Sequence, residues 1–209
     1  MAECGAAGLL EWAVAARPIP GESVSGDHCV VRVTDTEALL AVIDGLGHGP
    51  EAAAAAERAV DVLRENPAEP VEVLLLLCHT ALARTRGAAV TVASISTTKG
   101  SMSWLGVGNV EAVLLRGVPS GNPPRSSTEW ALLLGGIVGH QLPTLRPGVV
   151  DLQPGDMLLM ATDGIARTFA EEANVAAGPT RLADRILENL ARPNDDALVL
   201  VARYGTERS

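Results

Sequence analysis

The sequence predicts an α+β fold in which mainly antiparallel strands form sheets and the helices are segregated from them. Apolar segments follow one another across short turns, as in hairpins, and helical segments occur together instead of alternating regularly with strands. Hydrophobic residues make up 47% of the 209-residue chain, which is enough for the large core of one domain. Aromatic residues contribute only 2%, so aliphatic side chains must fill that core.

The first half of the chain is expected to contain three strands and then a pair of helices. Apolar and β-branched residues mark the strands, and Thr34 and Asp35 provide a turn between the second and the third. Pro50 suits the first turn of a helix, which is expected to end at Asn66 and Pro67. The predicted segments are strands 11–16, 29–33 and 37–43 and helices 51–65 and 71–84.

The second half is expected to contain further hairpin strands and one helix. Glycine-containing turns at residues 98–101 and 153–155 separate paired strands. Residues 118–128 are rich in Pro, Gly and Ser and are expected to form a flexible loop. The predicted segments are strands 88–96, 101–107, 111–116, 144–152, 156–161 and 197–204 and helix 180–190.

Charge and cysteine content exclude several classes of function. The net charge of −9 argues against nucleic acids and anionic membranes as partners, because both attract clustered basic residues. The three cysteines form no CxxC pair, so neither a zinc knuckle nor a disulfide framework is expected. The longest apolar run, residues 73–78, is far shorter than the ~20 residues that span a bilayer. The N-terminus has no basic region typical of a signal peptide, and a cytoplasmic protein is expected.

Four aspartates are predicted to lie where a strand meets a loop: Asp27, Asp44, Asp163 and Asp195. Asp44 directly follows a run of apolar residues, and a charge in that position is costly unless it is satisfied. Mg²⁺ and Mn²⁺ prefer carboxylate and carbonyl oxygens as ligands. An isolated Asp-Gly pair is more often an ordinary turn. The repetition of the pattern favours a metal site.

Several short motifs occur in an order that identifies a family. They are Ser25-Gly26-Asp27, Asp44-Gly45-Leu46-Gly47-His48-Gly49 before an alanine-rich helix, Arg86-Gly87-Ala88-Ala89, Gly106-Val107-Gly108-Asn109-Val110, Thr162-Asp163-Gly164 and Asp195-Asp196. In these motifs the chain resembles the metal-dependent protein serine/threonine phosphatases of type 2C (PPM), in their bacterial SpoIIE-like branch. It is most similar to short members of that branch that carry no sensor domain.

The resemblance implies a four-layer α/β/β/α sandwich, with two mainly antiparallel sheets flanked by helix pairs, in a single phosphatase domain over residues 1–209. It also implies two Mn²⁺ or Mg²⁺ ions at one edge of the sandwich. Asp44 is expected to bridge both ions, while the Gly45 carbonyl and Asp27 serve one of them. Asp163 and Asp195 are expected to hold the other ion.

The activity that the resemblance implies is hydrolysis of phosphoserine and phosphothreonine. Two ions about 3.5–4 Å apart lower the pKa of a water molecule, and the resulting hydroxide attacks phosphorus while the Ser or Thr alkoxide leaves. Asp44 and Asp163 are the expected catalytic residues, acting through the metals. No covalent intermediate is needed, so the lack of a nucleophilic cysteine motif is consistent with this chemistry.

Three positions depart from better-known members of the family. Leu46 replaces a His that is a candidate acid for the leaving group, which leaves the nearby His48 as a candidate for that role. Asn109 replaces an Asp associated with a third metal ion, and an amide is a poorer ligand than a carboxylate. Asp196 lies where relatives carry Asn or Asp, so it is expected to be a neighbour of the metals and not a first ligand.

The resemblance also suggests substrates, namely phosphorylated STAS-domain proteins of a bacterial stress-signalling complex, the stressosome. A phosphorylated anti-anti-sigma factor is the near alternative, and a non-catalytic pseudophosphatase that binds partners is another. Nucleotide binding is a rival interpretation of the glycines after Asp44. The dinucleotide fingerprint, however, requires G-x-G-x-x-G, and Pro50 occupies the position of its last glycine. The sequence predicts no oligomeric state.

Overall fold

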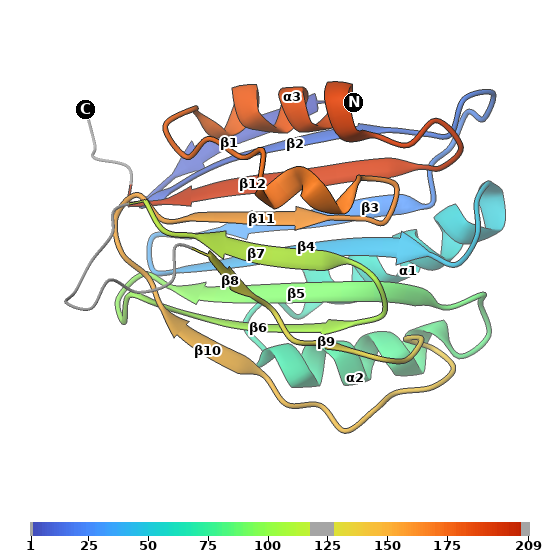
Figure 1. The fold of residues 1–209 in the computed structure, drawn as a ribbon. Coiled ribbons are helices and arrows are strands. Elements are labelled where there is room, and N and C mark those ends of the chain that lie inside the picture. The colour runs from blue at the N-terminus through green and yellow to red at the C-terminus, as the bar shows by residue number, and fades with distance from the viewer. Residues whose placement is uncertain (1, 118–127, 206–209) are drawn as a thin grey trace.

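Two mainly antiparallel sheets lie face to face in the computed structural model, which describes residues 2–117 and 128–205 (Figure 1). Sheet A has the strand order β1 (Ala2–Ala7), β2 (Leu10–Arg17), β12 (Ala197–Tyr204), β11 (Met157–Ala161), β7 (Glu111–Leu115) and β8 (Thr128–Trp130). Sheet B has the order β10 (Gly148–Asp151), β6 (Ser101–Val107), β5 (Ala88–Ser96), β4 (Glu37–Gly45) and β3 (Asp27–Val33). A two-residue strand, β9 (Leu133–Leu134), pairs in parallel with β6.

Helices cover the outer faces of both sheets. The outer face of sheet B carries the helix pair α1 (Pro50–Glu65) and α2 (Val71–Leu82). Sheet A carries α3 (Pro179–Leu190) together with a short 3₁₀ helix, η1 (Arg167–Ala170). The four-layer sandwich expected from the resemblance is therefore confirmed, with a single α-helix and a 3₁₀ turn as the outer layer on sheet A.

Three apolar layers hold the sandwich together, and β4 contributes to two of them. Leu40 and Val42 face sheet A, whereas Leu39, Ala41 and Ile43 face the helix pair. All five side chains are at most 2% exposed. A strand covered on both faces needs apolar residues at every position, which explains the unbroken run before Asp44.

The elements agree closely with the segments predicted from the sequence. The structure adds β1, β8 and β9, which the apolar pattern did not indicate. It also shortens the predicted strand 144–152 to β10, because Pro147 cannot donate a backbone hydrogen bond to a neighbouring strand. Of the predicted loop 118–128, residues 118–127 lie outside the described residues. Among the helices described, none is long and apolar enough to cross a membrane.

The topology brings several strand ends to one edge of the sandwich. β4 and β11 end at this edge, while β3 and β12, their antiparallel neighbours, begin there. It is the right-hand edge in Figure 1, where α1 also begins. The loops that carry the four aspartates therefore meet at one place although they are far apart in the sequence.

Candidate metal centre

The carboxylates that the sequence analysis selected come from both sheets and meet at this edge. Asp27 and Asp44 are direct partners in the β3–β4 ladder of sheet B. Asp163 follows the end of β11, and Asp195 precedes the start of β12, which pairs with β11 in sheet A. The charges of Asp163 and Asp195 act directly on Asp44, so the structure brings all four aspartates together.

Two neutral side chains orient these carboxylates. The Thr162 hydroxyl donates a hydrogen bond to Asp27 Oδ2 at 2.7 Å and accepts one from the Leu198 backbone N–H at 3.0 Å. Thr162 is buried, and its bond to Asp27 links sheet A to sheet B. The Asn109 amide donates to Asp163 Oδ2 at 2.6 Å and also contacts Asp44. From the sequence alone, Asn109 is only a departure from the family, and no role is expected for Thr162.

Asp196 fixes the loop that leads to Asp27. Its side chain is 3% exposed, and its two oxygens accept hydrogen bonds from the backbone N–H groups of Ile19 and Gly26, each at 2.7 Å. A carboxylate engaged by two amides is positioned to hold the chain in place. The motif Asp195-Asp196 thus contains one aspartate facing the cluster and one that anchors a neighbouring loop.

The glycine of each Asp-Gly pair allows a close backbone approach. A Cβ atom on Gly45 would lie 2.1 Å from the Ala52 carbonyl oxygen in α1. A Cβ atom on Gly164 would lie 1.7 Å from the Asp196 carbonyl oxygen. Both distances are shorter than any tolerated contact, so each turn requires glycine for packing.

The raised pKa values of the clustered aspartates indicate a site for a cation. Burial, followed by the charges of Asp163, Asp195 and Asp196, raises the pKa of Asp44 to about 7. Burial and the charge of Asp44 raise the pKa of Asp27 well above its ordinary value. The Asp195 pKa is raised as well, by burial and then by the charge of Asp163. A divalent ion would remove this repulsion.

The donor set fits a hard divalent ion held partly by water. In the described part of the chain, no group of three or more His, Cys, Asp or Glu side chains is arranged so that it could hold a metal ion, so water and carbonyl ligands would be needed as well. Mg²⁺ usually takes only one or two carboxylates and keeps several water molecules, and carbonyl oxygens are suitable further ligands. The residues present therefore match Mg²⁺ or Mn²⁺, and softer ligands are lacking among them.

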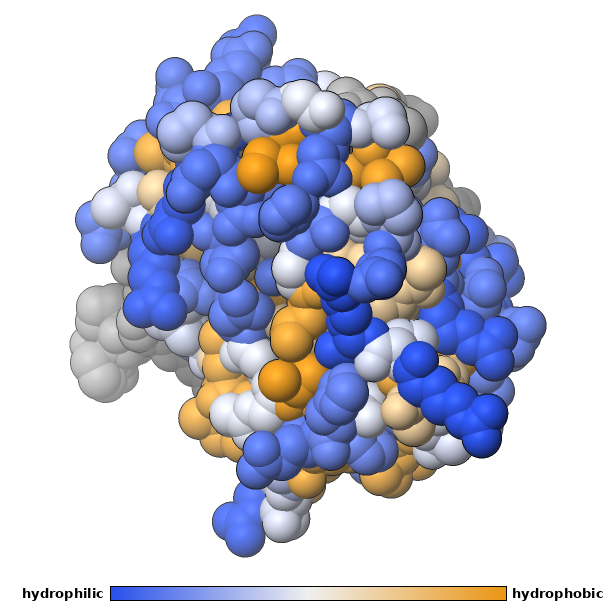
Figure 2. All heavy atoms as spheres, turned by 90° about the vertical axis from the view of Figure 1, so that its right-hand side faces the viewer, coloured by the Kyte–Doolittle hydropathy of each residue, from blue (hydrophilic) through white to orange (hydrophobic). Residues whose placement is uncertain are grey.

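His48 lies in the loop between β4 and α1, four residues after Asp44. Its Nδ1 atom is 2.5 Å from Glu22 Oε1, and the His48 side chain is 62% exposed. Arg86 forms an ion pair with Glu51 at the start of α1. Figure 2 views this edge from outside and shows a mainly hydrophilic surface with several smaller hydrophobic areas.

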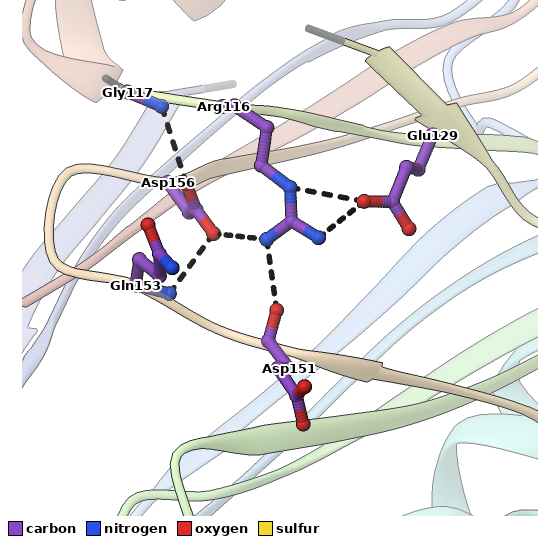
Figure 3. Close-up of polar contacts among 6 residues, drawn as sticks. All are labelled: Arg116, Gly117, Glu129, Asp151, Gln153 and Asp156. Carbon is purple, nitrogen blue, oxygen red and sulfur yellow. Dashed lines mark hydrogen bonds and ion pairs between the residues drawn. The ribbon is translucent and has the colours of Figure 1, made fainter. Parts of the chain in front are cut away.

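A second buried polar cluster lies at the opposite edge, where β7 ends and β11 begins (Figure 3). Arg116 donates hydrogen bonds to Asp156 at 2.5 Å and to the Asp151 carbonyl at 2.8 Å, and it pairs with Glu129. Asp156 also accepts hydrogen bonds from the backbone N–H groups of Gln153 and Gly117. Since no buried polar side-chain atom among the described residues lacks a hydrogen-bond partner, this cluster is explained as a link between strands.

Comparison with known protein families gives a match over most of the chain. Residues 34–205 match the family described as Stage II sporulation protein E (SpoIIE). A curated relative, phosphoserine phosphatase RsbX of Bacillus subtilis, is 25% identical over 145 residues, which are 69% of each protein.

Solved structures with the same fold include one from a study of the bacterial stressosome as a modular system adapted to control secondary messenger signalling. It is 33% identical, has a TM-score of 0.83, and covers 93% of this chain and 99% of its own. RsbX in complex with magnesium has a TM-score of 0.85 at 20% identity, covering 98% of this chain and 100% of its own. The PP2C domain of SpoIIE from Bacillus subtilis has a TM-score of 0.75 at 19% identity, covering 95% of this chain and 64% of its own.

Proposed function

Because the chain belongs to the SpoIIE family and is a metal-dependent serine/threonine phosphatase of the PP2C type, we propose that its substrates are phosphorylated STAS-domain proteins of a stressosome. The 33% identical neighbour comes from a stressosome study, and the curated relative is named a phosphoserine phosphatase. The first supports a role in stress signalling, and the second supports the chemistry. STAS-domain proteins are the substrates that the family resemblance implies.

We further propose that two Mg²⁺ or Mn²⁺ ions bind between the loops at the ends of β4 and β11. Asp44 would contact both ions, with Asp27 and the Gly45 carbonyl on one side and Asp163 and Asp195 on the other. The observation that carries this proposal is the convergence of carboxylates from both sheets, which raises the pKa of Asp44 to about 7. The oxygen-only donor set and the magnesium bound to the RsbX neighbour support the choice of ion.

When bound, the ions supply an activated water molecule and neutralise the phosphate oxygens. The chain's own residues keep the ligands in place for this chemistry. Thr162 holds Asp27, and Asn109 holds Asp163, each through a charge-assisted hydrogen bond. Asp196 fixes the loop before Asp27 through two backbone amides. Glu22 orients the His48 ring, which is the candidate for protonating the leaving alkoxide.

The test compares hydrolysis of p-nitrophenyl phosphate with dephosphorylation of a phosphorylated STAS-domain protein, each with Mn²⁺, with Mg²⁺ and with chelator. We expect both activities to require the metal and to be lost in Asp44→Asn and Asp163→Asn. Asp184→Asn, at an exposed position on α3, is the matched control and should retain both activities.

The possible outcomes test the proposed metal centre and the proposed substrate separately. Hydrolysis of the small ester with no loss of phosphate from the STAS protein would overturn the substrate assignment alone. Activity that survives Asp44→Asn would overturn the metal centre. An absence of activity on both substrates with either metal would indicate a non-catalytic binding module.

A further inference from the structure

Strand β3 is the last strand of sheet B, and sheet A continues beyond it. β11 contacts β4 and β12 contacts β3, so the next strands of sheet A, β2 and β1, lie past the edge of sheet B. In the described part of the chain, no strand pairs with the outer edge of β3. An edge of this kind presents backbone groups to which a further strand can bond.

The ladder between β3 and β4 shows which backbone groups face outward. Gly45 N–H donates a hydrogen bond to the Gly26 carbonyl at 3.0 Å. At the other end of the ladder, Thr34 N–H donates to the Glu37 carbonyl at 2.8 Å. Bonded and non-bonded pairs alternate along an antiparallel ladder, so the even-numbered residues of β3 point toward β4. The residues whose N–H and C=O groups point away from β4 are Asp27, Cys29, Val31 and Val33.

Most of these outward N–H groups are free. Asp27 N–H donates to Ser25 Oγ at 3.1 Å. Within residues 2–117 and 128–205, the N–H groups of Cys29 and Val31 have no hydrogen-bond partner. The edge of β3 therefore keeps donors and acceptors in the spacing that a new strand requires.

A groove of about 370 Å³ follows this edge, and we call it the edge groove. Asp27 and Cys29 line its floor, the β1–β2 hairpin lines one side and α1 lines the other. The residues of α1 that line it lie between Ala53 and Arg64. Over this distance the helix rises roughly 16 Å, which equals about five residues of extended chain.

The two sides of the edge groove differ in chemistry. The hairpin contributes Val14 and Ala16, which also pack in the core between the sheets, and the exposed Glu3. Helix α1 contributes Glu57 and Arg64, both exposed. Side chains of a strand point alternately to its two faces. A segment that fits the groove therefore alternates apolar residues toward the hairpin with polar residues toward α1.

The edge groove begins at the proposed metal centre, because Asp27 belongs to both. The loop residues Ser23 and Ser25 line the same end. A segment lying in the groove is therefore continuous with a residue held at the carboxylate cluster. Antiparallel pairing is more stable per residue than parallel pairing, and a segment antiparallel to β3 runs toward Asp27. Its residues then precede the residue at the cluster.

We propose that the edge groove binds the segment preceding the phosphoserine of the protein substrate, as an added antiparallel strand on β3. The proposal rests on the phosphatase function and metal centre proposed above. Backbone bonds to β3 and an apolar contact with Val14 and Ala16 select the segment. The groove therefore contributes to the choice of substrate and takes no part in hydrolysis.

The test uses synthetic phosphoserine peptides that carry five alternating valines and threonines either before or after the phosphoserine. With the flank before it, kcat/KM should exceed that of a glycine-flanked peptide by about tenfold. The flank placed after the phosphoserine should give no such gain. N-methylation of single flank amides should lower kcat/KM at alternate positions only, because every second N–H of an added strand points to β3. Shifting the flank by one residue should also lower it, since the valines then face α1.

A pair of variants tests the site of binding. Glu57→Trp places a large side chain in the groove from an exposed position and should remove the preference for the flank before the phosphoserine. Glu188→Trp, at an exposed position on α3, is the matched control and should keep that preference. The ratio of kcat/KM between two peptides is compared within each variant, so a general change in activity does not affect the result.

Hydrolysis of p-nitrophenyl phosphate separates this proposal from the proposed function. If the wild type hydrolyses that ester with metal but treats both flanks alike, or if N-methylation shows no alternation, the edge groove proposal alone is wrong. No hydrolysis of the ester or of any peptide would overturn the proposed function and this proposal with it. Concentration-dependent dimerisation that Glu57→Trp abolishes would replace substrate binding with self-association at the edge of β3.

Discussion

At the scale of single residues, Thr162 connects the two sheets at the point where metal binding is proposed. We expect Thr162→Val to weaken Mg²⁺ or Mn²⁺ binding about 10–100-fold, the usual effect of removing a group that orients a metal ligand. The variant keeps the shape of the side chain but leaves Asp27 and the Leu198 N–H without their partner. We therefore also expect a loss of about 1–3 kcal/mol in the free energy of unfolding.

Isothermal titration with each metal and urea denaturation of the metal-free protein measure the two effects of Thr162→Val. Thr180→Val, at an exposed position in α3, serves as the control and should change neither quantity. Unchanged metal affinity in Thr162→Val would show that Asp27 does not depend on this hydroxyl, or that Asp27 does not bind metal.

The glycines of the two Asp-Gly pairs are also open to test. We expect Gly45→Ala and Gly164→Ala each to cost more than about 3 kcal/mol in the free energy of unfolding, since each new methyl group collides with a backbone carbonyl. Gly135→Ala is the control, because a Cβ atom there would meet nothing within 4 Å. Thermal denaturation of the three variants measures the loss. Equal melting temperatures for all three would contradict the packing argument.

The aspartates of the candidate site could be predicted from sequence, whereas the residues that support them could not. An Asp after a buried strand is visible in the order of residues, as at Asp44. The bond from Thr162 to Asp27 joins residues 135 positions apart, and the bonds of Asp196 join it to residues about 170 positions away. Such contacts depend on how two sheets stack, and no local pattern encodes them.

At the scale of elements, Arg116 joins four segments of both sheets. It contacts Glu129 on β8, the Asp151 carbonyl at the end of β10 and Asp156 before β11. The charge-assisted bonds to Glu129 and Asp156 raise the Arg116 pKa, although burial acts in the opposite direction. The ion pair between Arg116 and Asp156 is buried, because the Arg116 side chain is 5% exposed and that of Asp156 only 1%.

We expect Arg116→Met to cost about 3–5 kcal/mol in the free energy of unfolding, because the variant leaves the Asp156 carboxylate buried without its counter-charge. Urea denaturation measures the loss, with the exposed Arg181→Met as the control. Adding Asp156→Leu to Arg116→Met should recover part of the stability, since no buried charge then remains. A loss below about 1 kcal/mol in the single variant would mean that the pair contributes no more than a surface ion pair.

Most elements could be predicted because their own residues specify them. The apolar run of β4 and the amphipathic pattern of α3 indicate a strand and a helix without any knowledge of their neighbours. β1 is different, since its sequence AECGAA has little strand preference and it pairs along its full length with β2. β9 is only two residues long and exists through its pairing with β6. Elements of this kind depend on a partner strand and leave no signal of their own.

At the scale of the whole molecule, the carboxylate cluster should make stability depend on pH and metal together. In the unfolded chain an Asp titrates near pH 4. In the folded chain the Asp44 pKa is about 7, and the Asp27 pKa is also raised. Between these values the folded state binds more protons than the unfolded state, so stability falls as pH rises. The stabilisation is complete below about pH 4 and is lost as pH passes through 7.

We therefore expect the metal-free protein to be less stable at pH 8 than at pH 5, with Asp44 alone contributing about 2–3 kcal/mol to the difference. Mg²⁺ at about 100 times its dissociation constant should restore about 3 kcal/mol at pH 8. It should restore little at pH 5, where protonated carboxylates do not bind it. Urea denaturation at both pH values, with chelator or with Mg²⁺, measures these effects, and Asp44→Asn should flatten the pH dependence. A metal-free protein that gains stability from pH 5 to pH 8 would show that the aspartates do not share one buried site.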